Sequence, residues 1–153
     1  MPNTRIEQEN KELKKLVSVN EEACEFYESA CEHVTNEQLR DSFRNLESLH
    51  RNIVINLQQK IRLNGGNPDH FEAIGGQYPG GWGELMTTFD NDIDETLIMY
   101  LEEAENRCLK YFNDTLQSEK VNPDTLPLLT HELSALEKSR DYMKALKSCL
   151  FQH

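Results

Sequence analysis

The sequence lacks long apolar runs and an excess of positive charge, and these two absences exclude several classes of function. No stretch reaches the roughly 20 apolar residues of a membrane span, and the N-terminal residues lack the apolar core of a signal peptide. The 153 residues carry 16 Lys and Arg against 27 Asp and Glu, a net charge of -11. This charge repels nucleic-acid phosphates and anionic lipid headgroups. We therefore expect an acidic, cytoplasmic protein that binds neither nucleic acid nor membranes.

The four cysteines lack the spacing of a redox motif or of a disulfide framework. Cys24 and Cys31 are separated by about 10.5 Å along a helix, which is too far for a disulfide between them. We interpret all four, including Cys108 and Cys149, as small reduced side chains of the interior. The chain also lacks a Gly-rich phosphate loop, a nucleophile elbow and zinc-finger spacing, so a non-enzymatic role is favoured.

Glycine is absent outside the central segment that runs from Gly65 to Gly83. This segment divides the chain into two halves whose apolar residues recur at alternating spacings of three and four, the period of amphipathic helices. Alternation typical of strands, with turn signals, does not occur. The sequence therefore predicts an all-α protein with two helices in each half.

The predicted helices cover residues 5–34, 36–63, 92–118 and 123–150. In the first half, Thr35 begins a capping-box pattern that ends at Gln38. In the second half, residues 92–95 can cap a helix, and Asn122 before Pro123 indicates another helix start. Residues 64–91 are long enough to run the length of a bundle, with a short helical turn at Trp82 and Leu85. We expect one domain over residues 1–153, an up-down four-helix bundle with this Gly/Pro-rich crossover.

A Glu-x-x-His pair in the second predicted helix is the most informative chemical pattern in the chain. Glu47 and His50 can both face the bundle interior, where such a pair forms half of a carboxylate-bridged iron or manganese centre. The equivalent pattern in the fourth helix runs from Glu137 to Arg140, with Arg in place of the second His. Because Arg stays protonated and has no lone pair to give, it cannot ligate a cation.

The first and third helices contribute further polar residues near this pair. Glu105 interrupts an apolar row of the third helix, and a buried carboxylate without a partner is costly to desolvate. In the first helix, Asn20 and Glu21 are the polar residues expected nearest to His50. The predicted metal ligands are therefore Glu47, His50, Glu105, Glu137 and Glu21.

A second interpretation is a bundle without metal, and the residues favour it. Here Arg140 takes the place of the cation by forming a buried ion pair with Glu105 and Glu137, while His50 bonds to Glu21 or Asn20. Such Arg-carboxylate pairs are geometrically favourable when they are bidentate.

The central segment resembles the crossover of an uncharacterised bacterial family of ferritin-like four-helix bundles, a domain of unknown function akin to the YciF-type stress proteins. The residues that carry this resemblance are 63–68 (LNGGNP), Gly75-Gly76, Gly81-Trp82 and Leu85.

The resemblance extends from about residue 13 to residue 146. Tyr27 and the stretch 102–105 fall where the family tends to carry Tyr and Glu. The family's usual His-Arg before Gly-Trp is replaced here by Pro79-Gly80. What the resemblance implies is a ferritin-like bundle without an established activity.

Two functional hypotheses follow. In the first, which we favour, a ferritin-like, stress-related protein acts without catalysis through assembly or an unknown protein partner. Val19, Phe26, Ala23 and Ala30 widen the apolar arc of the first helix, which predicts either packing against the crossover or a homodimer face. In the second, a partial carboxylate-histidine site holds iron or manganese for oxidation or iron handling. No cofactor is expected under the first hypothesis.

Overall fold

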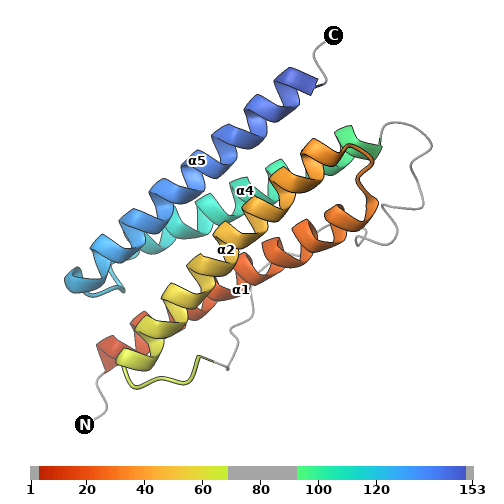
Figure 1. The fold of residues 1–153 in the computed structure, drawn as a ribbon. Helices are drawn as coiled ribbons and strands as arrows, with labels where there is room; N and C mark the ends of the chain where they lie inside the picture. Colours follow the sequence, from red (N-terminus) through yellow and green to blue (C-terminus); the bar gives the residue numbers. More distant parts are fainter. Residues whose placement is uncertain (1–3, 69–92, 151–153) are drawn as a thin grey trace.

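The computed structural model describes residues 4–68 and 93–150, and the chain is helical over most of these ranges (Figure 1). The helices are α1 (Thr4–His33), α2 (Glu37–Leu63), α4 (Ile93–Gln117) and α5 (Leu126–Leu150), with a short 3-10 helix η1 (Pro123–Thr125) before α5. The described residues contain no strand, and none of their helices is long and apolar enough to cross a membrane. The predicted all-α class and the four helices are confirmed. The expected helical turn at Trp82 and Leu85 lies outside the described residues.

The four helices form two antiparallel pairs, α1 with α2 and α4 with α5. The two pairs meet mainly through α1 and α4, whereas α5 touches α2 only sparsely. Figure 1 shows the turn between α1 and α2 at the same end of the bundle as the start of α4. Buried polar side chains lie in the middle of this arrangement.

The turn between α1 and α2 is held by Asp94 of α4. The carboxylate of Asp94 accepts hydrogen bonds from the backbone N of Thr35 at 2.8 Å, the Thr35 hydroxyl at 2.7 Å and the backbone N of Asn36 at 3.1 Å. Asn36 is the N-cap of α2, because its side chain accepts from the backbone N of Leu39 at 3.0 Å. The predicted capping box was therefore wrong by one residue. The N-cap is Asn36, and the Thr35 hydroxyl donates to Asp94 of α4 instead.

A second buried carboxylate joins three segments at the opposite end. Glu9 is fully buried and accepts a hydrogen bond from the backbone N of Asn122 at 2.8 Å and from the side chain of Asn64 at 2.6 Å. Asn122 is the N-cap residue of η1 and Pro123 begins that helix, as predicted, but the Asn122 side chain makes no capping hydrogen bond. An added Cβ at Gly66 would lie 2.6 Å from the Asn10 side-chain nitrogen and 3.0 Å from Cγ2 of Ile61, so a larger residue there requires these side chains to shift.

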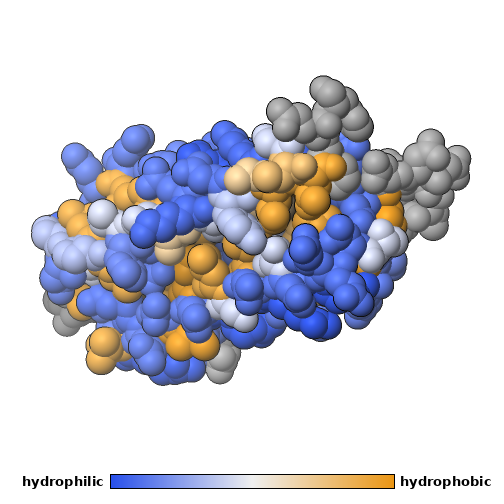
Figure 2. All heavy atoms as spheres, turned by 45° about the horizontal axis from the view of Figure 1, so that its top comes forward, coloured by the Kyte–Doolittle hydropathy of each residue, from blue (hydrophilic) through white to orange (hydrophobic). Residues whose placement is uncertain are grey.

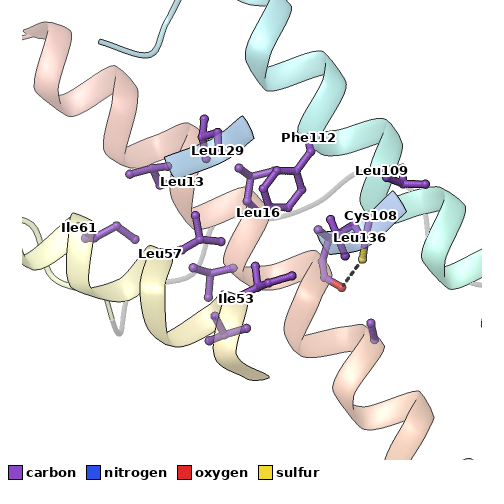
Figure 3. Close-up of a cluster of buried hydrophobic side chains, with 14 of the residues drawn as sticks. Leu13, Leu16, Ile53, Leu57, Ile61, Cys108, Leu109, Phe112, Leu129 and Leu136 are labelled. Atoms are coloured by element: carbon purple, nitrogen blue, oxygen red, sulfur yellow. Dashed lines mark hydrogen bonds between the residues drawn. The ribbon is translucent and has the colours of Figure 1, made fainter. Parts of the chain in front are cut away.

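The apolar core consists of two clusters. Figure 3 shows the first, where side chains from all four long helices converge; its labelled members include Leu13, Ile53, Phe112 and Leu136. The second cluster contains Tyr27, Phe43, Leu39, Leu97, Leu101 and Met143. Along α2, α4 and α5, one buried polar residue stands between the members of the two clusters. These residues are His50, Glu105 and Ser139.

Candidate functional site

Five buried polar side chains form a layer between the two apolar clusters, and we call it the polar layer. Its members are Asn20 and Tyr27 of α1, His50 of α2, Glu105 of α4 and Ser139 of α5. Ser139 is 2 % exposed and the other four are completely buried. Every long helix contributes at least one member, so the layer is a tertiary feature of the bundle.

One oxygen of Glu105 is the centre of the polar layer. Its Oε1 lies 2.7 Å from Nε2 of His50 and accepts a hydrogen bond from the Ser139 hydroxyl at 2.8 Å. The Tyr27 hydroxyl donates to the same oxygen. The other oxygen, Oε2, is buried and has no hydrogen-bond partner among the described residues. Side chains from three helices therefore contact Oε1, whereas Oε2 of the same carboxylate has no hydrogen-bond partner among the described residues.

The second nitrogen of His50 faces Asn20. Nδ1 of His50 lies 2.8 Å from Oδ1 of Asn20, and the amide nitrogen of Asn20 donates to the carbonyl of Leu16 at 2.8 Å. Oδ1 of Asn20 is thus an acceptor, and so is the carboxylate of Glu105. His50 therefore lies between an amide oxygen of α1 and a carboxylate oxygen of α4, and the 2.7 Å separation of its Nε2 from Oε1 is that of a buried pair.

Tyr27 closes the layer against α1. Its ring lies 5.7 Å from the ring of His50 and 6.1 Å from that of Phe43, measured between centroids. Burial raises the pKa of the Tyr27 phenol well above its ordinary value, and the neighbouring charge of Glu105 raises it further. The hydroxyl therefore stays protonated and remains a donor to Glu105.

The structure brings together two of the five predicted metal ligands, His50 and Glu105. Glu47 is partly buried and lies 3.6 Å from Arg51, measured between Oε2 and Nη2. Glu21 lines a surface hollow between α1 and α2, and Glu137 is exposed on α5. Within residues 4–68 and 93–150, no three His, Cys, Asp or Glu side chains are grouped so that they could hold a metal ion. A metal role for these five residues stays a prediction.

The predicted ion pair of Arg140 with Glu105 and Glu137 was wrong. Arg140 instead lies 3.3 Å from the carboxylate of Asp141, its neighbour in the chain. The physical reason is the rotation of α5, whose buried stripe passes through Ser139 rather than Arg140. The expected contact of His50 with α1 is confirmed for Asn20.

Ser139 is a member of the polar layer that the sequence did not predict. The signal was its spacing: it stands three residues after Leu136 and four before Met143, and all three are buried. A polar residue at such a position interrupts the apolar stripe in the same way as Glu105 does in α4. Its hydroxyl reaches Glu105, which a hydrophobic residue could not satisfy.

All four cysteines are free, as predicted, but only two of them are buried. Cys24 and Cys108 are buried and donate to backbone carbonyls, at 3.7 Å to Glu47 and 3.6 Å to Val19; Figure 3 shows the second contact. Cys149 is exposed, so the prediction of an interior position was wrong there. Burial raises the pKa of Cys24 to about 11 and that of Cys108 well above its ordinary value.

These raised pKa values predict that the fold weakens in alkaline solution. A thiol whose pKa is higher in the folded state ionises first in the unfolded chain, so its stabilising contribution is complete below about pH 8.5 and declines above it. For the fully buried Cys108 we expect a loss of about 1 to 2 kcal/mol between pH 7.5 and pH 10. The raised pKa of Cys24 lowers stability in alkaline solution in the same way, and that of Tyr27 does so from about pH 10.

Urea unfolding under reducing conditions at pH 7.5, 9 and 10 measures this loss. Cys108→Ala should flatten the decline, because the variant has no thiol to ionise at that position. Cys149→Ala serves as the control, since it removes a thiol that is exposed in the folded state. Stability that stays constant or rises between pH 7.5 and 10 would contradict the prediction.

Comparison with known proteins agrees with this architecture. No curated protein matches the chain. Among solved structures, the chain is similar to the ferritin like, diiron-carboxylate proteins from Bacillus anthracis str. Ames, with 15% sequence identity and a TM-score of 0.59. That match covers 97% of this chain and 95% of the other, and it confirms the predicted ferritin-like fold. The model of a domain of unknown function, DUF2383, matches residues 8–118, and the chain therefore belongs to the DUF2383 family.

Proposed function

We propose that this protein is a non-catalytic ferritin-like bundle that acts through assembly or protein partners, and that its polar layer replaces a metal centre. The observation that carries the proposal is the bonding of Glu105. A single oxygen of this carboxylate is contacted by Tyr27, His50 and Ser139, from three other helices. We propose that a protonated His50 supplies the balancing charge. The charge of Glu105 is thus compensated by the protein itself, without a bound cation.

The donor set of the polar layer does not fit a two-metal centre. The similar solved structure is described as diiron-carboxylate, and such centres take one Glu from each of two helices and a Glu-x-x-His pair from each of the others. The polar layer contains one carboxylate and one imidazole, and its remaining members are an amide and two hydroxyls. Glu47, Glu137 and Glu21 do not join it. No chemical step through such a centre follows from these residues.

The surface supports binding of a basic protein segment. A hollow of about 490 Å³ lies between α1 and α2; its lining includes Glu21, Glu25 and Glu28. Ile55, which is 45% exposed, lines the same hollow, and Arg51 is the basic residue of its lining, so acidic side chains outnumber basic ones there. On the face shown in Figure 2, separate apolar patches interrupt a mostly hydrophilic surface. Charge complementarity therefore favours a partner that carries Lys or Arg beside an apolar residue.

The predicted homodimer stays a prediction, but its original basis is weakened. Val19, Ala23 and Ala30 are buried within the single chain and do not form an exposed face. Size-exclusion chromatography with light scattering decides between assembly of identical copies and binding of another protein. A dimer supports self-assembly, and a monomer directs attention to the acidic hollow.

Metal analysis tests the metal-independent part of the proposal. The protein is loaded anaerobically with ferrous iron, desalted and analysed, in parallel with Glu47→Ala/His50→Ala and with Glu105→Gln. We expect the wild type to retain no more iron than either variant, because no second buried carboxylate accompanies Glu105. Iron that is retained by the wild type and lost from both variants would overturn the proposal. It would favour the alternative, an iron- or manganese-binding oxidase or iron-handling protein.

A further inference from the structure

Ser139 holds the position where a second acidic side chain would complete a cation site. Its Oγ lies 2.8 Å from Oε1 of Glu105, and Nε2 of His50 lies 2.7 Å from the same oxygen. Ser139 is 2 % exposed and His50 and Glu105 are completely buried, so water does not compete for this point. The three side chains come from α5, α2 and α4, and the surrounding core fixes their positions.

We infer that Ser139 is the specificity-determining residue that keeps divalent cations out of the polar layer, and that a carboxylate at position 139 converts the layer into a site for Fe²⁺ or Mn²⁺. This inference rests on the proposed metal independence of the natural chain. Asp at position 139 places an oxygen near the present hydroxyl, beside Oε1 of Glu105. Two ionised carboxylates this close repel each other unless a cation or a proton lies between them.

The ligand types of the altered layer favour the cation. With Asp at position 139, two carboxylates and one imidazole would face one buried point from three helices. Carboxylate and imidazole are ligand types that suit iron and manganese, and a divalent cation offsets the negative charge of two carboxylates.

The open oxygen of Glu105 strengthens the inference. Oε2 is buried, and the part of the chain that the structure describes gives it no hydrogen-bond partner. A bound cation would satisfy this atom, in exchange for the present contact between Nε2 of His50 and Oε1. Oε1 would then keep the hydrogen bond from Tyr27.

Ser139→Asp tests the inference, with Ser134→Asp as the matched control, because Ser134 is exposed on the same helix. Both variants and the wild type are loaded anaerobically with Fe²⁺ or with Mn²⁺, desalted, analysed for metal and unfolded by heat with and without the cation. We expect stoichiometric metal in Ser139→Asp alone. Its unfolding temperature should rise by about 5–10 °C at a cation concentration near 100 times Kd. Ser139→Asn, of similar size but uncharged, should bind no metal.

Each outcome decides the matter. A folded Ser139→Asp variant that retains no metal overturns the inference. A variant that is unfolded both with and without cation overturns it as well, because the cation is expected to relieve the repulsion. A variant that folds only with the cation supports it. Metal retained by the wild type is a different result, because it refutes the proposed metal independence rather than the effect of the carboxylate at position 139.

Discussion

Replacing Glu105 by Gln is expected to lower the free energy of unfolding by about 3 to 5 kcal/mol, the usual cost of removing one partner from a buried ion pair. The substitution leaves the charge of His50 without a counter-charge in a completely buried site. It also weakens the hydrogen bonds that Tyr27 and Ser139 donate to the carboxylate. Urea unfolding followed by circular dichroism at pH 7.5 measures the loss.

A double-mutant cycle separates the ion pair from the rest of the polar layer. His50→Leu leaves Glu105 charged and unpaired, so it should be nearly as harmful as Glu105→Gln. His50→Leu/Glu105→Leu removes both side chains and should cost less than the sum of His50→Leu and Glu105→Leu measured singly, with a coupling of about 1 to 3 kcal/mol. Glu137→Gln is the control: its side chain is exposed, and we expect a change within about 0.5 kcal/mol.

Two results would refute this description of the layer. A loss below about 1 kcal/mol for Glu105→Gln would mean that the carboxylate bears no compensated charge in the folded state. Additive effects of His50→Leu and the Glu105 substitution would mean that the two residues are not an ion pair. Nitrogen NMR of the His50 ring supplies an independent readout, because the proposed imidazolium carries a proton on both nitrogens.

The sequence predicted most of the fold because the apolar spacing of each helix is a local property. The stripe of α2 passes through Phe43, Leu46, His50 and Ile53, and all four are buried. The same reasoning placed Glu105 in the interior, because it interrupts the apolar row of α4. Local spacing is therefore enough to place three of the five members of the polar layer, Asn20, His50 and Glu105, in the interior. The direct contact of His50 with Glu105, at 2.7 Å between Nε2 and Oε1, was not predicted.

The fourth helix shows where such reasoning fails. In α5 the stripe can be drawn through Leu133 and Arg140 or through Glu132 and Ser139, because both pairs are seven residues apart. The second pair is buried. Because both of its residues are polar, the spacing of apolar residues did not indicate that they face the interior. One residue corresponds to about 100° of rotation on a helix. The prediction therefore placed Arg140 in the site, where the structure has Ser139.

Contacts between distant segments also escaped prediction. Asp94 was expected to help begin its own helix, but its carboxylate binds Thr35 and Asn36, which stand 59 and 58 residues earlier. No local pattern indicates such a partner, since the contact arises only when α4 is packed beside the turn between α1 and α2. Asp94 therefore contributes to stability through a tertiary contact, and its replacement tests how strongly the two helical pairs are joined.

Asp94→Ala is expected to reduce the free energy of unfolding by about 2 to 4 kcal/mol. The change removes three hydrogen bonds to a charged acceptor, and two of the donors are the backbone N–H groups of Thr35 and Asn36. Asp94 is only 8% exposed, so water does not readily replace the lost carboxylate. Its negative charge in the first turn of α4 also interacts favourably with the helix dipole, and this contribution disappears as well.

Two further variants make the result specific. Asp94→Asn keeps one acceptor oxygen and should lose about half as much stability as Asp94→Ala. Asp114→Ala removes an exposed carboxylate from the same helix and should change stability by less than about 0.5 kcal/mol. Hydrogen exchange at the amides of Thr35 and Asn36 should accelerate in Asp94→Ala, because both amides lose their acceptor. If both amides remain protected and the stability is unchanged, Asp94 does not hold the turn, and the joint between the two pairs rests on apolar packing alone.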